Sequence, residues 1–393
     1  MAVPSAREAR RGAFWNDRAV RGVLFQVIVA GIVVAVAWYL FSNTLNNLAL
    51  RHISTGFGFL GREAGFEIGE SQIPYSPADS YSRAILVGLV NTAIVSVVGI
   101  VLCTILGTIV GIARLSSNWL VAKLAAVYVE TIRNTPVLLQ LLFWYVLIGT
   151  ALPGPRQAWQ PLPGLFLSNR GVRMPAPIFD SVHLMMLGLA VLGIGASVWW
   201  ARRCRLRQEA TGRRPPLLLP ALGFILLPPL ILFVAAGAPS SFDVPALRGF
   251  NFAGGMGFSP ELTALTFGLT VYTASYVAET VRAGILAVPK GQTEAARALG
   301  LSGGRVLRLV VLPQAVRIII PPLISLYLDL IKNSSLAIAI GYPDLVSVTN
   351  TMINQTGQAI EGVAIQMAIY LLVSLAISAL LNWYNARIAL VTR

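Results

Sequence analysis

The side chains best suited to chemistry in this sequence are polar ones that interrupt long apolar stretches. Lys332, Asn333 and Ser334 follow one another at the end of such a stretch. An ammonium group with amide and hydroxyl donors beside it can bind a carboxylate. Charged side chains inside membrane segments usually face the protein interior, where they often mark a transport path. These residues are therefore a candidate substrate site. The alternative is that Asn333 and Ser334 only satisfy a break in a helix.

Other polar residues in apolar stretches are candidates for the same path. Tyr272 and Tyr276 are four residues apart, so a helix places them on one face, where they could line a cavity or simply pack. Glu279 and Arg282 are three residues apart, and we expect them either to form a structural pair or to border the path. Asn91, in an earlier apolar stretch, is a further candidate.

Two more pairs have the spacing at which charged side chains on a helix can neutralise each other. Asp329 precedes Lys332 by three residues, and Glu130 precedes Arg133 by three. On a helix, Glu130 and Arg133 can therefore pair, and Asp329 and Lys332 could neutralise one another.

Enzyme motifs do not accompany these residues. The chain holds no G-x-x-x-x-G-K-[ST] loop and no H-E-x-x-H. Its two histidines and two cysteines form neither a metal-ligand pattern nor a disulfide framework. The sequence therefore predicts no ATPase activity, no metal site and no cofactor in this chain.

Composition places the chain among membrane proteins. Of its 393 residues, 56% are hydrophobic and 12% are charged, against about 25% charged in soluble chains. A helix needs roughly 20 apolar residues to cross a bilayer. Eight stretches are long enough: residues 23–41, 84–113, 125–148, 182–200, 217–238, 262–288, 314–331 and 362–384. The sequence predicts an all-α integral membrane protein with about eight transmembrane helices. In the second stretch, Gly99, Gly107 and Gly111 predict close helix packing.

The basic residues are distributed unevenly between alternate loops, and this sets the orientation. Twenty of the 30 lysines and arginines lie in the two tails, in the loops after the second, fourth and sixth stretches, or, as Arg317 does, where the last of these loops enters the seventh stretch. Seven lie in the other loops. By the positive-inside rule both termini are cytoplasmic, which is an N-in, C-in topology. The basic residues behind the net charge of +14 thus set the orientation in the membrane and also contribute to binding lipid headgroups. We therefore discount nucleic acid as a partner.

Residues 289–313 are the longest polar interruption in the C-terminal half, and we expect them to form a helical elbow. Good helix formers at 294–299 are followed by Gly300, where a helix stop belongs. Ser302 can cap a second short helix that reaches Leu312, and Pro313 then starts a new apolar segment. Alanines keep the exposed turn thin enough to enter a groove on another protein.

At this elbow the chain resembles the binding-protein-dependent ABC importer permeases. Their signature is Glu-Ala-Ala, three residues, Gly, nine residues, a β-branched residue, any residue and Leu-Pro. Here every spacing is kept: Glu294, Ala295, Ala296, Gly300, Val310, Leu312 and Pro313. The resemblance implies that these residues, together with Arg297, couple the chain to a cytoplasmic ATPase. We expect Glu294 to lie at the positive end of the first helix and Gly300 to end that helix in a left-handed conformation.

Three further blocks resemble the polar-amino-acid subfamily of these permeases: residues 128–149, 272–285 and 330–345. The resemblance covers about residues 83–149 and 261–387. Between these parts lies an insertion, 150–260, with a Pro-rich outer loop and two extra transmembrane helices joined by an Arg-rich inner loop. The long forms that share this insertion are permeases of general or glutamate/glutamine/aspartate/asparagine importers.

The resemblance implies a type I ABC importer transmembrane domain at residues 83–387, with a cytoplasmic coupling loop at 289–313. Residues 1–82 then form a cytoplasmic tail, an extra transmembrane helix and a periplasmic segment. It also implies a heterodimer with a second homologous permease, a cytoplasmic ATPase dimer that carries ATP and Mg²⁺, and a periplasmic amino-acid-binding protein. The chain would then translocate L-amino acids across the bacterial inner membrane by alternating access.

Two other classes of function compete with this interpretation. An ion-coupled secondary transporter predicts internal repeats and midplane acidic residues, and the sequence shows no repeat. A membrane-embedded enzyme needs convergent catalytic groups, and no recognised motif supplies them. Co-purification of an ATPase with the chain distinguishes the three classes.

Overall fold

The computed structural model describes residues 18–50, 55–212, 215–238 and 240–388. The tail arginines before residue 18, Arg213 and Arg214 of the predicted inner loop, and Arg393 lie outside the described residues. The longer helices are α1 (Arg18–Leu50), α2 (Tyr81–Ala113), α3 (Trp119–Arg133), α4 (Val137–Ala151), α5 (Ser181–Thr211), α6 (Leu218–Ala235), α7 (Pro260–Leu286), α10 (Leu312–Asn333), α11 (Leu345–Thr356) and α12 (Ala359–Ile388). The chain divides into two compact units, Met1–Leu89 with Leu345–Leu375, and Val90–Asp344 with Ala376–Arg393.

In the first unit, the segment after α1 folds onto α11. A 3-10 turn, η2 (Phe57–Gly61), buries Phe59, which packs with Tyr81 against Leu345 and Met352. The Tyr81 hydroxyl donates to the Gln355 side chain at 3.1 Å. Helix α1 itself is apolar along its length and buries none of its hydrophobic window within the chain. Its side chains therefore suit contact with lipid.

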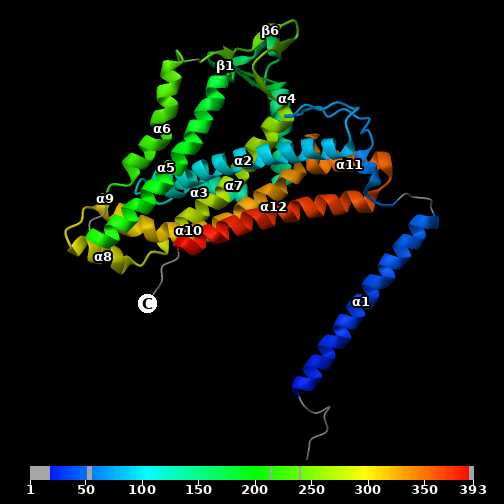
Figure 1. The fold of residues 1–393 in the computed structure, drawn as a ribbon, viewed down its shortest axis with the longest axis horizontal. Helices are drawn as coiled ribbons and strands as arrows, with labels where there is room; N and C mark the ends of the chain where they lie inside the picture. The colour runs from blue at the N-terminus through cyan, green and yellow to red at the C-terminus, as the bar shows by residue number, and fades with distance from the viewer. Residues whose placement is uncertain (1–17, 51–54, 213–214, 239, 389–393) are drawn as a thin grey trace, which may run out of the picture. The chain divides into compact units, whose positions relative to one another are not determined.

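The centre of the second unit is α7, which packs against α3, α4 and α10 (Figure 1). Helix α2 approaches it closely, because a Cβ on Gly107 would lie 2.5 Å from the Val277 side chain and one on Gly111 would lie 2.6 Å from the Ala278 carbonyl oxygen. Side chains at these positions would push the helices apart. The glycines thus set the spacing between α2 and α7.

The predicted span 125–148 is not one helix. It is divided into α3 and α4, which meet at an angle of 105°. Pro136 has no N–H for a helix ladder and disfavours a helical conformation in the residue before it. The buried Gln140 side chain donates to the carbonyls of Ile132 at 2.9 Å and Thr135 at 3.0 Å. It thereby satisfies backbone groups that the bend leaves without helix partners.

The predicted elbow is correct in its first helix and in the start of its second helix after Ser302, but wrong in where the second helix ends. Helix α8 (Lys290–Ala298) ends before Gly300, as expected. The second helix does not stop at Leu312, because α9 (Gly303–Val306) continues through a π-helical turn, η4 (Leu307–Val311), directly into α10. A proline ring clashes with the carbonyl four residues earlier in a regular helix, and the wider π turn relieves that clash at Pro313. A 3-10 segment, η5 (Ser334–Ile340), follows α10.

The insertion contains two helices and a set of short strands that the sequence does not predict. Helices α5 and α6 form a hairpin (Figure 1). Strands β1 (Trp159–Leu162), β2 (Leu165–Ser168), β3 (Gly171–Met174) and β8 (Met256–Phe258) make an antiparallel sheet in the order β1-β2-β3-β8. Two further pairs are β4 (Ala176–Pro177) with β5 (Phe242–Asp243), and β6 (Ala246–Arg248) with β7 (Asn251–Ala253). Another 3-10 turn, η3 (Pro155–Gln157), precedes β1.

Within the described residues, six helices are long and apolar enough to cross a membrane, or seven if α3 and α4 count as one bent span. The predicted span that this count omits corresponds to α7. It has 27 residues, which is about 40 Å of helix, but it carries many polar side chains. Three of these, Thr270, Thr273 and Ser275, are buried and therefore face protein.

Candidate functional site

A polar cavity of about 340 Å³ lies between α7 and α10. Its lining comes from one stretch of each helix: Tyr272, Thr273, Tyr276, Leu326, Asp329, Leu330, Lys332 and Asn333. Four residues predicted from the sequence as path residues, Tyr272, Tyr276, Lys332 and Asn333, therefore meet at one cavity. Helical spacing accounts for the grouping on each helix, and the packing of α7 on α10 joins the two groups.

The two tyrosines form a hydrogen-bonded pair on α7. Their hydroxyl oxygens lie 3.2 Å apart and their ring centroids 5.1 Å apart. The Arg133 guanidinium at the end of α3 lies 5.0 Å from the Tyr276 ring centroid. A cation held over an aromatic face is attracted by the ring quadrupole. The pair thus offers hydroxyl groups to the cavity while a cation lies against one of its rings.

Charges of both signs line the α10 side of the cavity. Asp329 and Lys332 do not form the ion pair that their spacing allows: the ion pairs found among the described residues join other side chains. Both side chains are exposed, and both lie on the side of α10 that lines the cavity. Each is therefore available to a ligand, and together they match a molecule that carries an ammonium and a carboxylate.

The remaining candidates lie away from this cavity. Ser334 is buried, and its hydroxyl donates to the Ile331 carbonyl at 2.7 Å. Ser335 likewise donates to the Lys332 carbonyl at 2.7 Å, so both serines satisfy carbonyls where α10 ends. The buried Asn91 side chain donates to the Pro343 carbonyl at 2.9 Å.

Glu279 belongs to a cluster of charges one turn beyond Tyr276. It accepts hydrogen bonds from Arg282, with 3.1 Å between Nε and Oε2, and from Arg114, which follows α2. Glu130 and Arg133 do not form the pair that their spacing allows. Glu130 lies 3.9 Å from Arg114 instead, and Arg133 is the residue against Tyr276. The cluster ties the ends of α2, α3 and α7 together.

The loop with the Glu-Ala-Ala signature presents a polar and small-residue surface. Glu294, Ala295, Arg297 and Ala298 are exposed, whereas Ala296 is buried against Val306 and Val311. The adjacent Leu299, which the sequence analysis did not single out, is 83% exposed. An apolar side chain held this far out of a folded loop is suited to a protein partner. At the far end of the loop Leu312 and Pro313 are also exposed.

Gly300 gives this loop its shape. Its φ is +79°, the left-handed conformation expected of it. Its N–H donates to the Arg297 carbonyl at 2.9 Å, and the Leu301 N–H donates to the Ala296 carbonyl at 3.2 Å. These two bonds define a Schellman motif. The expectation for Glu294 is wrong, because α8 begins at Lys290 and places Glu294 in its fifth position, beyond the positive end.

Sequence reasoning missed Asp329 and Thr273 as cavity residues. The spacing of three residues that allows Asp329 to pair with Lys332 also places both on one face of the helix, and this is the signal that could have found Asp329. Thr273 has no signal in the sequence that separates it from other buried threonines. Among the described residues, no group of three or more His, Cys, Asp or Glu side chains is placed to hold a metal ion.

An α-helical membrane core with a polar cavity between two helices and an exposed loop suited to a protein partner is compatible with a transport subunit. Comparison with known families gives a match to "Binding-protein-dependent transport system inner membrane component" over residues 216–390. The general L-amino acid transport system permease protein AapQ of Rhizobium johnstonii is 49% identical over 389 residues, which is 97% of each chain.

A second relative of full length is the glutamate/glutamine/aspartate/asparagine transport system permease protein BztB of Rhodobacter capsulatus. It is 42% identical over 413 residues, which covers 96% of each chain. The chain belongs to the family of binding-protein-dependent transport system inner membrane components. It is a multi-pass inner-membrane permease of an ABC importer. Permeases of this family are not themselves the enzyme of the transporter, and they work with an ATPase and a substrate-binding protein.

Proposed function

We propose that this permease carries L-amino acids and that the cavity between α7 and α10 lies on their path. The observation that carries the proposal is the presence of Asp329 and Lys332, not paired with each other, at one cavity. An amino acid is a zwitterion, so its carboxylate complements Lys332 and its ammonium complements Asp329. The names of AapQ and BztB, which both describe amino-acid transport, support the same cargo.

The loop from Pro289 to Pro313 docks in a groove of a cytoplasmic ATPase. Ala295 and Ala298 keep its outer face thin, and the exposed Leu299 supplies an apolar anchor. ATP and Mg²⁺ belong to that partner, and ATP-driven closure of an ATPase dimer moves the loop. Because the loop continues without a break into α10, its motion is delivered to the helix that carries Asp329 and Lys332. The cavity then alternates between the two sides of the membrane.

The assembly we infer is a heterodimer with a second homologous permease, and a periplasmic binding protein delivers the amino acid. Both termini and the coupling loop are cytoplasmic, as the excess of basic residues in alternate loops indicates. Counting α7 with the apolar spans and the bent pair gives eight crossings. Membrane lipid is a further partner, and nucleic acid is not.

Reconstituted proteoliposomes test the proposal. Vesicles that contain this chain, its partner permease and the ATPase should accumulate labelled L-amino acids when ATP is inside and the binding protein is outside. Uptake that follows a proton or sodium gradient without ATP would support a secondary transporter instead. If no amino acid in a broad panel is taken up but another solute is, the proposal of an amino-acid cargo is overturned, while the family membership stands.

A further inference from the structure

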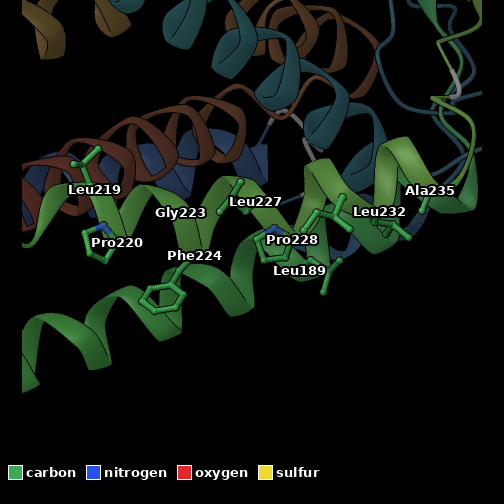
Figure 2. A pocket seen from close by; sticks show the side chains of 10 residues that line it. Leu189, Leu219, Pro220, Gly223, Phe224, Leu227, Pro228, Leu232 and Ala235 are labelled. Atoms are coloured by element: carbon green, nitrogen blue, oxygen red, sulfur yellow. The ribbon is translucent and has the colours of Figure 1, made fainter.

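An apolar groove of about 840 Å³ runs along α6 and is bordered by α5 (Figure 2). It extends from Leu219 near the start of α6 to Ala235 at its end, and Leu189 contributes from α5. Gly223 leaves space in its middle, because a Cβ there would meet only the Leu227 side chain, at 3.6 Å. Helix α6 is one of the apolar spans, so the exposed apolar side chains of the groove suit contact with the hydrocarbon of a bilayer.

Three contacts fix the register of α5 against α6. The Gly193 backbone approaches Phe224, where a Cβ would lie 2.1 Å from the carbonyl oxygen. The Ser197 hydroxyl donates to the Ala221 carbonyl at 2.9 Å, and the Trp200 indole donates to the Pro216 carbonyl at 3.3 Å. Residues 197–200 of α5 therefore lie beside the beginning of α6. Helix α5 continues past this point to Thr211, which is about 16 Å of further helix.

The projecting part of α5 carries arginines, and two of them share the face that borders the groove. Arg207 follows Leu189 by 18 residues, which is five whole helical turns, and Arg203 lies one turn before Arg207. The Arg203 guanidinium lies 4.6 Å from the ring centroid of Trp199, which is one of the α5 residues beside the beginning of α6. By the same helical spacing Arg202 and Arg205 lie on the opposite side of α5. No ion pair found in the described part of the chain involves these arginines.

We propose that the α5–α6 hairpin binds an anionic phospholipid. Its acyl chain lies in the groove along α6, and its phosphate contacts Arg203 and Arg207. The apolar lining selects hydrocarbon, and the arginines at one end select a negative headgroup, because guanidinium groups form strong charge-assisted bonds with phosphate. Within this chain α5 and α6 pack chiefly against each other, so the lipid helps to hold the hairpin in the membrane.

Native mass spectrometry of the transporter purified in mild detergent tests this site. We expect phosphatidylglycerol to be retained in preference to phosphatidylcholine with the same acyl chains. The double variant Arg203→Gln with Arg207→Gln should lose that preference, with binding weakened roughly fivefold for each arginine. The matched double variant Arg202→Gln with Arg205→Gln removes the same charge from the other side of α5 and should keep the preference.

The groove is tested separately with Gly223→Phe, which fills its middle and should reduce retention of both lipids. Gly195→Phe adds the same side chain where no atom lies within 4 Å of a Cβ and outside the groove lining, and it should bind lipid normally. Size-exclusion profiles report whether each variant is folded. The proposed site would be overturned if both double arginine variants lost the phosphatidylglycerol preference equally. Normal phosphatidylglycerol retention in Gly223→Phe would overturn it as well. Loss of the ATPase from the Arg203 and Arg207 variant, with lipid retained, would assign these arginines to an acidic protein surface instead.

Discussion

The hydroxyl oxygens of Tyr272 and Tyr276 lie 3.2 Å apart, one turn apart on α7, at a cavity that α10 lines with Asp329 and Lys332. The pair can donate and accept, so it can orient a ligand that the two charges attract. Tyr276→Phe removes one hydroxyl. It should raise the substrate concentration that stimulates the ATPase by about fivefold, because about one hydrogen bond is lost. The control is Tyr327→Phe on α10, whose hydroxyl bonds to Thr104 and does not line the cavity. An equal effect of both variants would argue against a role for the pair.

Lys332 and Asp329 should act on opposite ends of the same amino acid. Lys332→Met is expected to weaken substrate-stimulated ATPase activity roughly tenfold, because a charge-assisted bond to the carboxylate is lost. Asp329→Asn should weaken the ATPase stimulation by amino acids, but it should have a smaller effect on the stimulation by analogues that lack the α-ammonium. Lys123→Met removes an exposed lysine of α3 and should have no effect. Unchanged transport by a folded Lys332→Met protein would make Lys332 structural or this subunit the passive half of the heterodimer.

The packing of α2 on α7 predicts a stability difference between two glycines. Gly107→Ala places a methyl group 2.5 Å from the Val277 side chain and should cost about 1–3 kcal/mol of stability. Gly149→Ala on α4 meets nothing within 4 Å and should be neutral or slightly stabilising. Thermal melting followed by size-exclusion chromatography measures both. A lower melting temperature for Gly149→Ala than for Gly107→Ala would contradict the packing.

The orientation of the insertion can be read with impermeant thiol reagents. In a background without Cys103 and Cys204, a cysteine at Arg205 should be labelled only from the cytoplasmic side, and one at Gln157 only from the periplasm. Both positions are exposed, so failure to label reflects sidedness rather than burial. The reverse pattern would overturn the topology, and with it the cytoplasmic assignment of the coupling loop.

The sequence was most informative where helical spacing and fixed motifs act locally. It placed Tyr272 with Tyr276 and Lys332 with Asn333, and it predicted the left-handed Gly300. It could not show that α7 and α10 bring these residues together, because that depends on contacts such as the close approach of Gly284 to Ile319.

Other features escaped prediction for separate physical reasons. Strands such as β3 are only two to four residues long, so they give no periodic signal. Pro313 is compatible either with a helix start or with a helix that widens into a π turn, and residue type alone does not decide between them.

The central claim is that the loop from Pro289 to Pro313 couples an ATPase to the transmembrane helices, and Gly300 gives the most direct test. A Cβ at Gly300 meets no atom within 4 Å, but a β-branched residue in the left-handed conformation costs about 1–2 kcal/mol. Gly300→Val should therefore change the orientation of α8 without disturbing the membrane helices. Gly300→Asn should be tolerated, since asparagine adopts this conformation more readily. Glu294→Lys reverses an exposed charge on the same helix and should weaken docking without changing the backbone.

The deciding measurement is recovery of the ATPase in a pull-down, made on the same variants whose uptake of labelled amino acid is recorded. ATPase recovery and uptake should fall together in Gly300→Val and in Glu294→Lys, while membrane insertion and pairing with the second permease persist. Gly300→Asn should keep normal ATPase recovery and normal uptake. Normal ATPase recovery with normal uptake in Gly300→Val and Glu294→Lys would contradict the coupling role and leave this segment as an ordinary surface loop.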